Sequence, residues 1–288
     1  MRITQSMLFQ TALQGMRARL SDLSRAQVRA TTLQNVNVMS DDPVSGAELS
    51  RIQSSQRDVQ QFRRNATFAR TRLNVEDSVL TSMRDLIGQA RSIATNVSQL
   101  SAVDPERQRA LTQLDDIQKQ LVALGNTKVG DQYILGGSLT GAPPFEADGT
   151  YVGDSQQLKT QIDENVYVNT VHAGDHSVGG AMLSLGTLQQ SVATESASQI
   201  EISASNLQAF ADQLLSDQAD VGARLQVIKD ADTRLAARSN LNLDRRDTIQ
   251  AVDPAEAVVT LQTAQTSLER AYAVVSRVLQ TNILDFLK

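Results

Sequence analysis

The stretch that decides the fold is PAEAVVTLQTAQTSLERAYAVVSRVLQTNILDFLK, residues 254–288. Its apolar residues recur at alternating spacings of three and four, which is typical of a coiled-coil seam. They are Val258, Leu261, Ala264, Leu268, Ala271, Val275 and Val278. Asp253-Pro254 supplies an N-cap acceptor and a proline at the first helical position. The sequence therefore predicts a helix that needs a partner along its apolar face.

Residues 1–33 have the same spacing of apolar residues, so we expect the two end segments to pair with each other. The candidate functional site is this assembly seam. It comprises Phe9, Leu13, Met16, Leu20, Leu23, Leu261, Leu268, Val275, Leu279, Ile283 and Phe286. The alternative is a pair of amphipathic helices packed separately on a compact core.

The composition favours long helical seams over a thick core. Of the 288 residues 41% are hydrophobic, but only 3% are aromatic and tryptophan is absent. The absence of cysteine excludes disulfide scaffolds and thiolate chemistry. No run of ~18 apolar residues predicts a membrane span, and polar residues interrupt the start of the chain where a signal peptide would have its apolar core. We expect a protein that stays in the cytosol or leaves by a route without a cleaved signal.

Charge is distributed unevenly along the chain. Residues 1–72 contain eleven arginines and five acidic residues, whereas residues 131–220 contain twelve acidic residues and Lys159. An arginine-rich segment can indicate nucleic-acid binding. These arginines lack interleaved aromatic residues for base stacking, so that function remains only an alternative.

Between the end segments the pattern predicts more helices. A helix begins at Pro43 and runs to about Leu100, a length of ~85 Å at 1.5 Å per residue. Apolar residues occur every seven positions along it: Ile52, Val59, Ala66, Leu73, Leu80, Ile87 and Ala94. A shorter helix follows Asp104-Pro105, and another long helix begins near Gln199.

Residues 131–198 lack the helical spacing of apolar residues that the preceding segments have. Short β-prone runs such as 158–162 and 166–171 alternate with Gly-Gly, Pro-Pro and Asp-Gly breaks, which predicts a small β-rich domain. Residues 184–198 form a polar transition whose structure the pattern does not determine.

The predicted fold is mainly α. It is an elongated antiparallel helical rod or coiled coil with paired chain termini and a small β-rich domain inserted at the far tip. We predict a terminal coiled-coil assembly domain (1–42 and 250–288), a helical rod domain (43–130 and 199–249) and a β-rich inserted domain (131–198).

No residue pattern indicates an enzyme. His172 and His176 are four apart but lie among glycines with no third ligand, so we predict no metal site. Asp115 and Asp116 are adjacent, and on a helix they would point about 100° apart onto a solvated face. Phosphate-loop, nucleophile-elbow and zincin motifs are absent from the sequence. We therefore expect no catalytic residues and no cofactor.

Several segments together resemble the flagellin family, most closely its hook-associated members at the junction of hook and filament. The segments are Ser40-Asp41-Asp42-Pro43, Tyr133-Ile134-Leu135-Gly136-Gly137, Pro144-Phe145, Val221-Gly222-Ala223-Arg224-Leu225, Asp253-Pro254-Ala255-Glu256-Ala257 and Ile283-Leu284-Asp285-Phe286-Leu287. One segment departs from the family pattern. The family usually has Thr-Gly followed by Lys or Arg before Asp-Asp-Pro, and here Thr32-Leu33-Gln34-Asn35 stands in that place.

The resemblance implies a structural subunit that is exported by the flagellar type III system with an export chaperone. It would form a ring of its own copies between the inner hook-associated junction protein and flagellin, outside the cell, without nucleic acid and without membrane insertion. Two alternatives remain open: a flagellin that forms the filament itself, and a basic coiled-coil protein that binds nucleic acid.

Overall fold

The computed structural model describes residues 5–35, 42–98, 105–171, 173–174, 177–194 and 196–286. Within these ranges, the side chains of residues 5, 6, 8, 9, 177 and 278–286 are not described.

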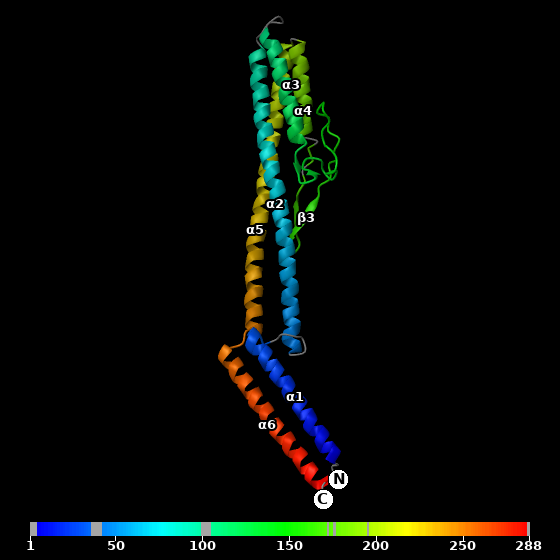
Figure 1. Ribbon diagram of the computed structural model, residues 1–288. Helices are drawn as coiled ribbons and strands as arrows, with labels where there is room; N and C mark the ends of the chain where they lie inside the picture. Colours follow the sequence, from blue (N-terminus) through cyan, green and yellow to red (C-terminus); the bar gives the residue numbers. More distant parts are fainter. Residues whose placement is uncertain are drawn as a thin grey trace. The chain divides into compact units, whose positions relative to one another are not determined.

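Helices form most of the described chain (Figure 1). They are α1 (Gln5–Thr32), α2 (Pro43–Val97), α3 (Pro105–Gly125), α4 (Ser177–Ala193), α5 (Ala197–Gln250) and α6 (Pro254–Phe286). The strands are β1 (Lys128–Val129), β2 (Gln132–Tyr133), β3 (Lys159–Asp163) and β4 (Val166–Asn169). The prediction of a mainly helical chain with long antiparallel helices and paired end helices is confirmed.

The chain divides into two compact units, which are described separately here. The first comprises residues 1–57 and 239–288, and the second comprises residues 58–238. In the second unit α2 and α5 run antiparallel, because Arg70 forms an ion pair with Asp232 and Arg84 donates a hydrogen bond of 2.9 Å to Gln218.

Seven-residue rows of apolar side chains hold α2 and α5 together. All seven α2 residues predicted for this row are buried. The matching row on α5 contains Ile200, Leu207, Leu214, Val221, Ile228 and Leu235, each no more than 1% exposed. A spacing of seven places every member on nearly the same side of a helix. Within the second unit, the members of these rows from Ala66 to Ala94 and from Ile200 to Ile228 belong to one buried cluster.

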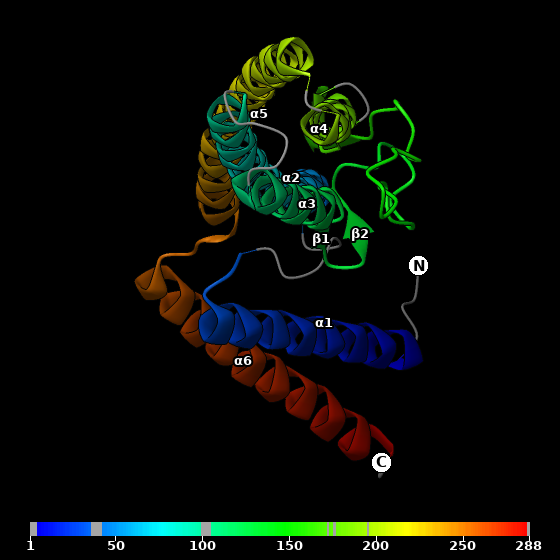
Figure 2. The same cartoon turned by 90° about the horizontal axis from the view of Figure 1, so that it is seen from above.

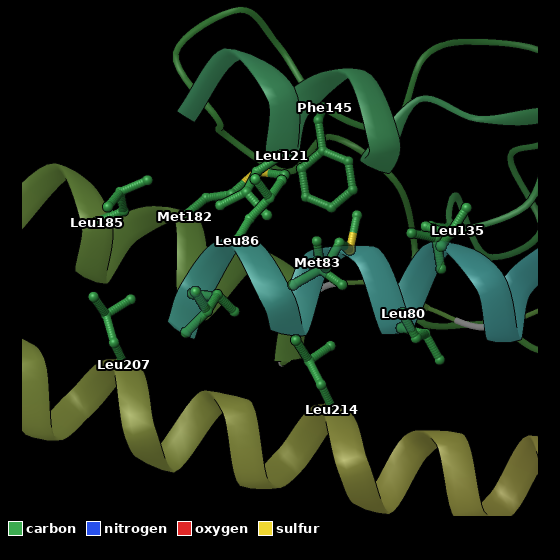
Figure 3. Close-up of a cluster of buried hydrophobic side chains, with 14 of the residues drawn as sticks. Leu80, Met83, Leu86, Leu121, Leu135, Phe145, Met182, Leu185, Leu207 and Leu214 are labelled. Atoms are coloured by element: carbon green, nitrogen blue, oxygen red, sulfur yellow. The ribbon is translucent and has the colours of Figure 1, made fainter. Parts of the chain in front are cut away.

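The second unit has a core with contributions from helices and loops alike. Figure 3 shows Leu121 of α3 and the loop residue Phe145 on one side of α2 and Leu207 and Leu214 of α5 on the other, all members of one buried cluster. Phe145 is only 2% exposed and its ring lies 5.2 Å from that of Tyr151. Residues of the segment between α3 and α5 are thus part of the same core as the helices.

Both two-stranded sheets are antiparallel. β1 pairs with β2, and β3 pairs with β4 around Asn165, whose positive φ of 59° suits the hairpin turn. The β3–β4 hairpin lies along the sides of the helices, since Asn65 of α2 donates to the Gln161 carbonyl at 2.7 Å and Arg234 of α5 contacts Asp163 at 3.1 Å. The predicted location at the tip of the helices needs correction, because the buried face of the hairpin covers α2 and α5 laterally.

Helix α4 occupies residues 177–193 and so includes most of the segment 184–198, whose structure the sequence pattern did not determine. Its sequence, SVGGAMLSLGTLQQSVA, is rich in glycine, which lowers helix propensity. Packing offsets this penalty. A Cβ atom on Gly180 would lie 2.2 Å from the Phe210 ring, so glycine permits close contact between α4 and α5.

A buried arginine attaches the strands to α2. Arg72 is 1% exposed and donates to the Gln132 side chain at 3.0 Å and to the Tyr133 carbonyl at 2.5 Å. Burial lowers the pKa of Arg72, and the nearby charge of Glu76 acts in the opposite direction. This side chain therefore holds β2 against the helix through a charge-assisted bond.

Helices long and apolar enough to span a membrane are absent from the residues that the structure describes.

Candidate assembly interface

Helices α1 and α6 of the first unit lie side by side and antiparallel (Figures 1 and 2). Their adjoining ends are tied by backbone hydrogen bonds. The Asn35 amide donates to the Gln250 carbonyl at 2.7 Å, and the Val252 amide donates to the Leu33 carbonyl at 3.3 Å. These bonds flank an antiparallel bridge between Gln34 and Ala251. The two segments that the sequence predicted to pair are thus joined by main-chain contacts at this end.

The end of α1 contains a leucine in an unusual backbone conformation. Leu33 has a φ of +54°, in the left-handed region that glycine usually occupies after a helix. Its amide donates to the Arg29 carbonyl at 2.9 Å, which ends the helix. The family pattern has glycine in this segment, and here the turn forms with leucine instead, at a cost in backbone strain.

At the start of α2, Asp42 acts as the N-cap. Its carboxylate accepts hydrogen bonds from the amides of Val44 and Ser45 at 3.0 and 3.2 Å and from the Ser45 hydroxyl at 2.6 Å. The bonds from Ser45 lower the pKa of Asp42, because they stabilise the charged form. The helix start that Asp-Pro predicted is therefore present in the structure.

The described residues of the predicted seam differ in burial. Leu268 is 9% exposed and Leu20 is 41% exposed. The other described members are half-buried: Leu13, Met16, Leu23, Leu261 and Val275. Phe9, Leu279, Ile283 and Phe286 lie outside the described side chains.

Among the described side chains of the pair, the most deeply buried are alanines. Ala26 is 4% exposed and Ala257 is 1% exposed, whereas the neighbouring Val258 is 50% exposed. The seam therefore begins at Ala257, and the assignment of Val258 to it is wrong. Small side chains let the helix backbones approach closely near the bridge. The three consecutive apolar residues 257–259 left the choice open, because spacings of both three and four to Leu261 fit a seam.

Large apolar side chains remain exposed on both helices. They are Met7, Val28, Val258, Val259, Tyr272 and Val274, each at least 42% exposed. A helix pair buries one stripe of each helix, and here apolar residues extend beyond that stripe. Exposed apolar surface of this extent is typical of interaction sites.

An open cleft of about 900 Å³ runs between α1 and α6. Its lining includes Asp22, which forms ion pairs with Arg19 at 3.2 Å and Arg25 at 2.9 Å, and Val259 from the other helix. These charged side chains are exposed, so their pairing contributes little to stability. The cleft combines paired charged side chains with apolar surface.

Within the described ranges, no group of three or more potential ligand side chains is arranged to hold a metal ion. His172 and His176 lie outside those ranges, so the structure does not describe their surroundings.

Comparisons with known proteins match both parts of the chain to one family. The model for the bacterial flagellin N-terminal helical region matches residues 3–140, and that for the C-terminal helical region matches residues 205–287. The chain belongs to the flagellin family. Within the matched ranges lie α1 to α3 and α6, including the antiparallel pair that forms the candidate interface.

Among curated relatives, this flagellin-family chain is 28% identical over 177 residues to flagellar hook-associated protein 3 of Escherichia coli (strain K12), covering 61% of this chain and 56% of the relative. The Salmonella typhimurium protein of the same name is 27% identical over 176 residues, covering 60% and 56%. The chain thus spans little more than half the length of the curated relatives it matches.

Solved structures share the fold at low identity. FlgL of Bacillus cereus has a TM-score of 0.62 and 18% identity, covering 68% of this chain and 99% of that one. A putative flagellar hook-associated protein from Vibrio parahaemolyticus has a TM-score of 0.65 and 17% identity, covering 74% and 99%. The flagellar junction protein FlgL of Legionella pneumophila has a TM-score of 0.54 and 15% identity, covering 71% and 100%. At this identity the likeness concerns the fold.

Proposed function

We propose that the protein is a structural subunit of the bacterial flagellum, located outside the cell at the junction between hook and filament. The single observation that supports this most is the α1–α6 pair, which belongs to flagellin-family helical regions and leaves large apolar side chains exposed. The names of the curated relatives favour the junction over the filament.

In this proposal, segments 1–42 and 250–288 form the assembly domain. Its exposed valines and tyrosine are covered when neighbouring subunits pack against them. Full burial of one such side chain contributes roughly 1.5–3 kcal/mol. The exposed side chains are about half buried in the single chain, so covering the rest of several of them contributes to holding a subunit in an assembly, against the cost of association.

The proposed partners are further copies of the protein in a ring, the inner hook-associated junction protein on one side and flagellin on the other. An export chaperone of the flagellar type III system would bind the chain before secretion. Nucleic acid and membrane insertion have no part in this role. Several arginines of the basic segment are engaged within the fold, since Arg72 is buried and Arg70 pairs with Asp232.

The location can be tested by immunogold labelling of isolated flagella and by deletion of the gene. We expect label at the hook–filament boundary only, and a deletion strain that releases flagellin into the medium. Label along the whole filament would instead identify a filament subunit.

Variants can test whether the exposed face of α6 carries assembly. Val259→Asp combined with Val274→Asp places charges at positions that are 60% and 58% exposed, so we expect normal folding and secretion but loss of incorporation. Leu183→Asp is the matched control, because Leu183 is 68% exposed on α4. If both variants supported filament growth equally, the exposed face of α6 would not be part of the assembly interface.

A further inference from the structure

The second unit carries an exposed aromatic side chain on α2 that its own fold does not use. Phe68 is 46% exposed, although Ala66, Ala69 and Leu73 on the same helix are fully buried against the core. At 100° per residue, Phe68 points away from the side of α2 that bears these residues. It lies one turn from Asn65, which contacts the β3 strand.

A cleft lies where the β3–β4 hairpin meets α5. It has a volume of about 410 Å³, and its lining combines Tyr167 and Lys159 of the hairpin with Ala223, Val227 and the ion pair of Asp220 and Arg224 on α5. Tyr167 and Val227 are 56% and 40% exposed, so both present apolar surface to solvent. A cavity of roughly 150 Å³ accommodates benzene, and this cleft is large enough for a phenyl ring.

The two features lie on different elements of one subunit. Phe68 is on α2, whereas the described lining of the cleft comes from the hairpin and α5 alone. The hairpin contacts α2 through Asn65 and α5 through Arg234. An exposed aromatic side chain on α2 and a cleft between the hairpin and α5 favour a head-to-tail contact between copies. A series of such contacts can close into a ring.

Charge at the two flanks is complementary. Arg64 is exposed one turn before Phe68, and its guanidinium donates a hydrogen bond to Gln61. Asp230 is exposed one turn after Val227 and accepts a hydrogen bond from Gln226. Because α2 and α5 run antiparallel, two copies oriented the same way would bring Arg64 toward Asp230 when Phe68 enters the cleft.

We propose that Phe68 of one copy inserts into the cleft formed by β4 and α5 of the next copy, with Arg64 facing Asp230. This inference rests on the proposed function, since it assigns a lateral contact within the junction ring. It gives the β3–β4 hairpin a role as one wall of a subunit interface. An aromatic side chain in a pocket, bordered by charges, is the usual anchor of a protein contact.

Photo-crosslinking tests the contact in assembled flagella. Phe68 is replaced by the photoreactive analogue benzoylphenylalanine, which keeps an aromatic ring at this position. Irradiation should give a product of twice the chain mass, in which residue 68 is joined to a peptide containing Tyr167 or Val227. The same analogue at Leu183, an exposed position on α4, is the control and should give no such product.

Charge exchange provides an independent measurement. Arg64→Asp should reduce the yield of the dimeric product, and addition of Asp230→Arg should restore it. A product that joins residue 68 to residue 68, to another part of the chain or to a different protein would overturn the proposed contact. Absence of the product in labelled junctions would do the same. Immunogold label missing from the junction would instead contradict the proposed function, so the two failures are distinguishable.

Discussion

Arg72 donates a hydrogen bond of 2.5 Å to the carbonyl of Tyr133, sixty-one residues further along the chain. This bond joins the middle of α2 to the end of β2. Arg72 is almost completely buried, and Glu76 is fully buried one turn away.

Replacement of Arg72 by Met should therefore destabilise the second unit severely. The variant leaves the Tyr133 carbonyl without the Arg72 donor and removes the charge of Arg72 that interacts with Glu76. Removing one member of a buried charged group typically costs about 3–5 kcal/mol. The free energy of unfolding measured in urea would show the effect. Arg70→Met is the control, because Arg70 pairs with Asp232 at the surface and should cost no more than ~1 kcal/mol. Equal losses in the two variants would contradict the importance assigned to burial.

Two adjacent leucines of α5 offer a test of the helix seam. Leu214 is fully buried in the row facing α2, whereas Leu215 is 52% exposed. Leu214→Ala should lower the free energy of unfolding by about 2–5 kcal/mol, and Leu215→Ala should change it by no more than ~0.5 kcal/mol. Chemical denaturation of both variants measures the difference. A larger loss for Leu215→Ala would mean that the register of α5 is wrong.

The left-handed backbone of Leu33 predicts a substitution that stabilises the first unit. Glycine adopts this conformation without the steric conflict of a Cβ atom, so Leu33→Gly should relieve strain of about 1 kcal/mol or more. Leu33→Ala retains the Cβ atom and should give no such gain. Amide hydrogen exchange at Val252, which donates to the Leu33 carbonyl, reports the stability of this turn. Faster exchange in the glycine variant than in the alanine variant would show that strain at Leu33 is negligible.

Asp154 should make the loop around Gly137 sensitive to acid. The hydroxyl and amide of Ser138 donate to its carboxylate and hold the pKa of Asp154 below its ordinary value. A depressed pKa stabilises the folded state above the ordinary aspartate value of about 3.9. This stabilisation is lost as the pH falls from there through the lower folded value.

Asp154→Asn should therefore be less stable than the wild type at neutral pH, and the difference should shrink below about pH 4. Thermal unfolding at several pH values provides the measurement, with Asp115→Asn as a control on an exposed helical site. A difference between Asp154→Asn and the wild type that stays constant across this range would exclude the proposed role of the carboxylate.

The regular helices could be predicted from sequence because their burial repeats every seven residues. The predicted row from Ile52 to Ala94 is buried throughout, and the Asp-Pro pairs mark the starts of α2 and α6. Such a pattern shows which side of a helix is buried. It can therefore be recognised in the sequence even when the partner that covers this side is unknown.

The errors arose where a residue's role depends on distant contacts. Glycines of α4 resemble loop residues, but Gly180 is required by the ring of Phe210 on α5. The cleft beside Tyr167 is formed by a hairpin and a helix that are far apart in sequence. Sequence periodicity indicated where the assembly seam lies, but it could not show that Val258 is exposed and Ala257 buried.

The bridge between Gln34 and Ala251 has a consequence for the order of folding. The two bridged residues are 217 positions apart in the sequence. A chain that is made or exported from its N-terminus therefore presents α1 long before α6. Closing so long a loop carries a substantial entropic cost unless the intervening chain has already folded. We expect α1 and α6 to join last, with the second unit acting as the template that brings them together. Until α6 pairs with α1, the apolar side of α1 remains uncovered. An export chaperone could therefore bind this side of α1 only before the two helices have paired.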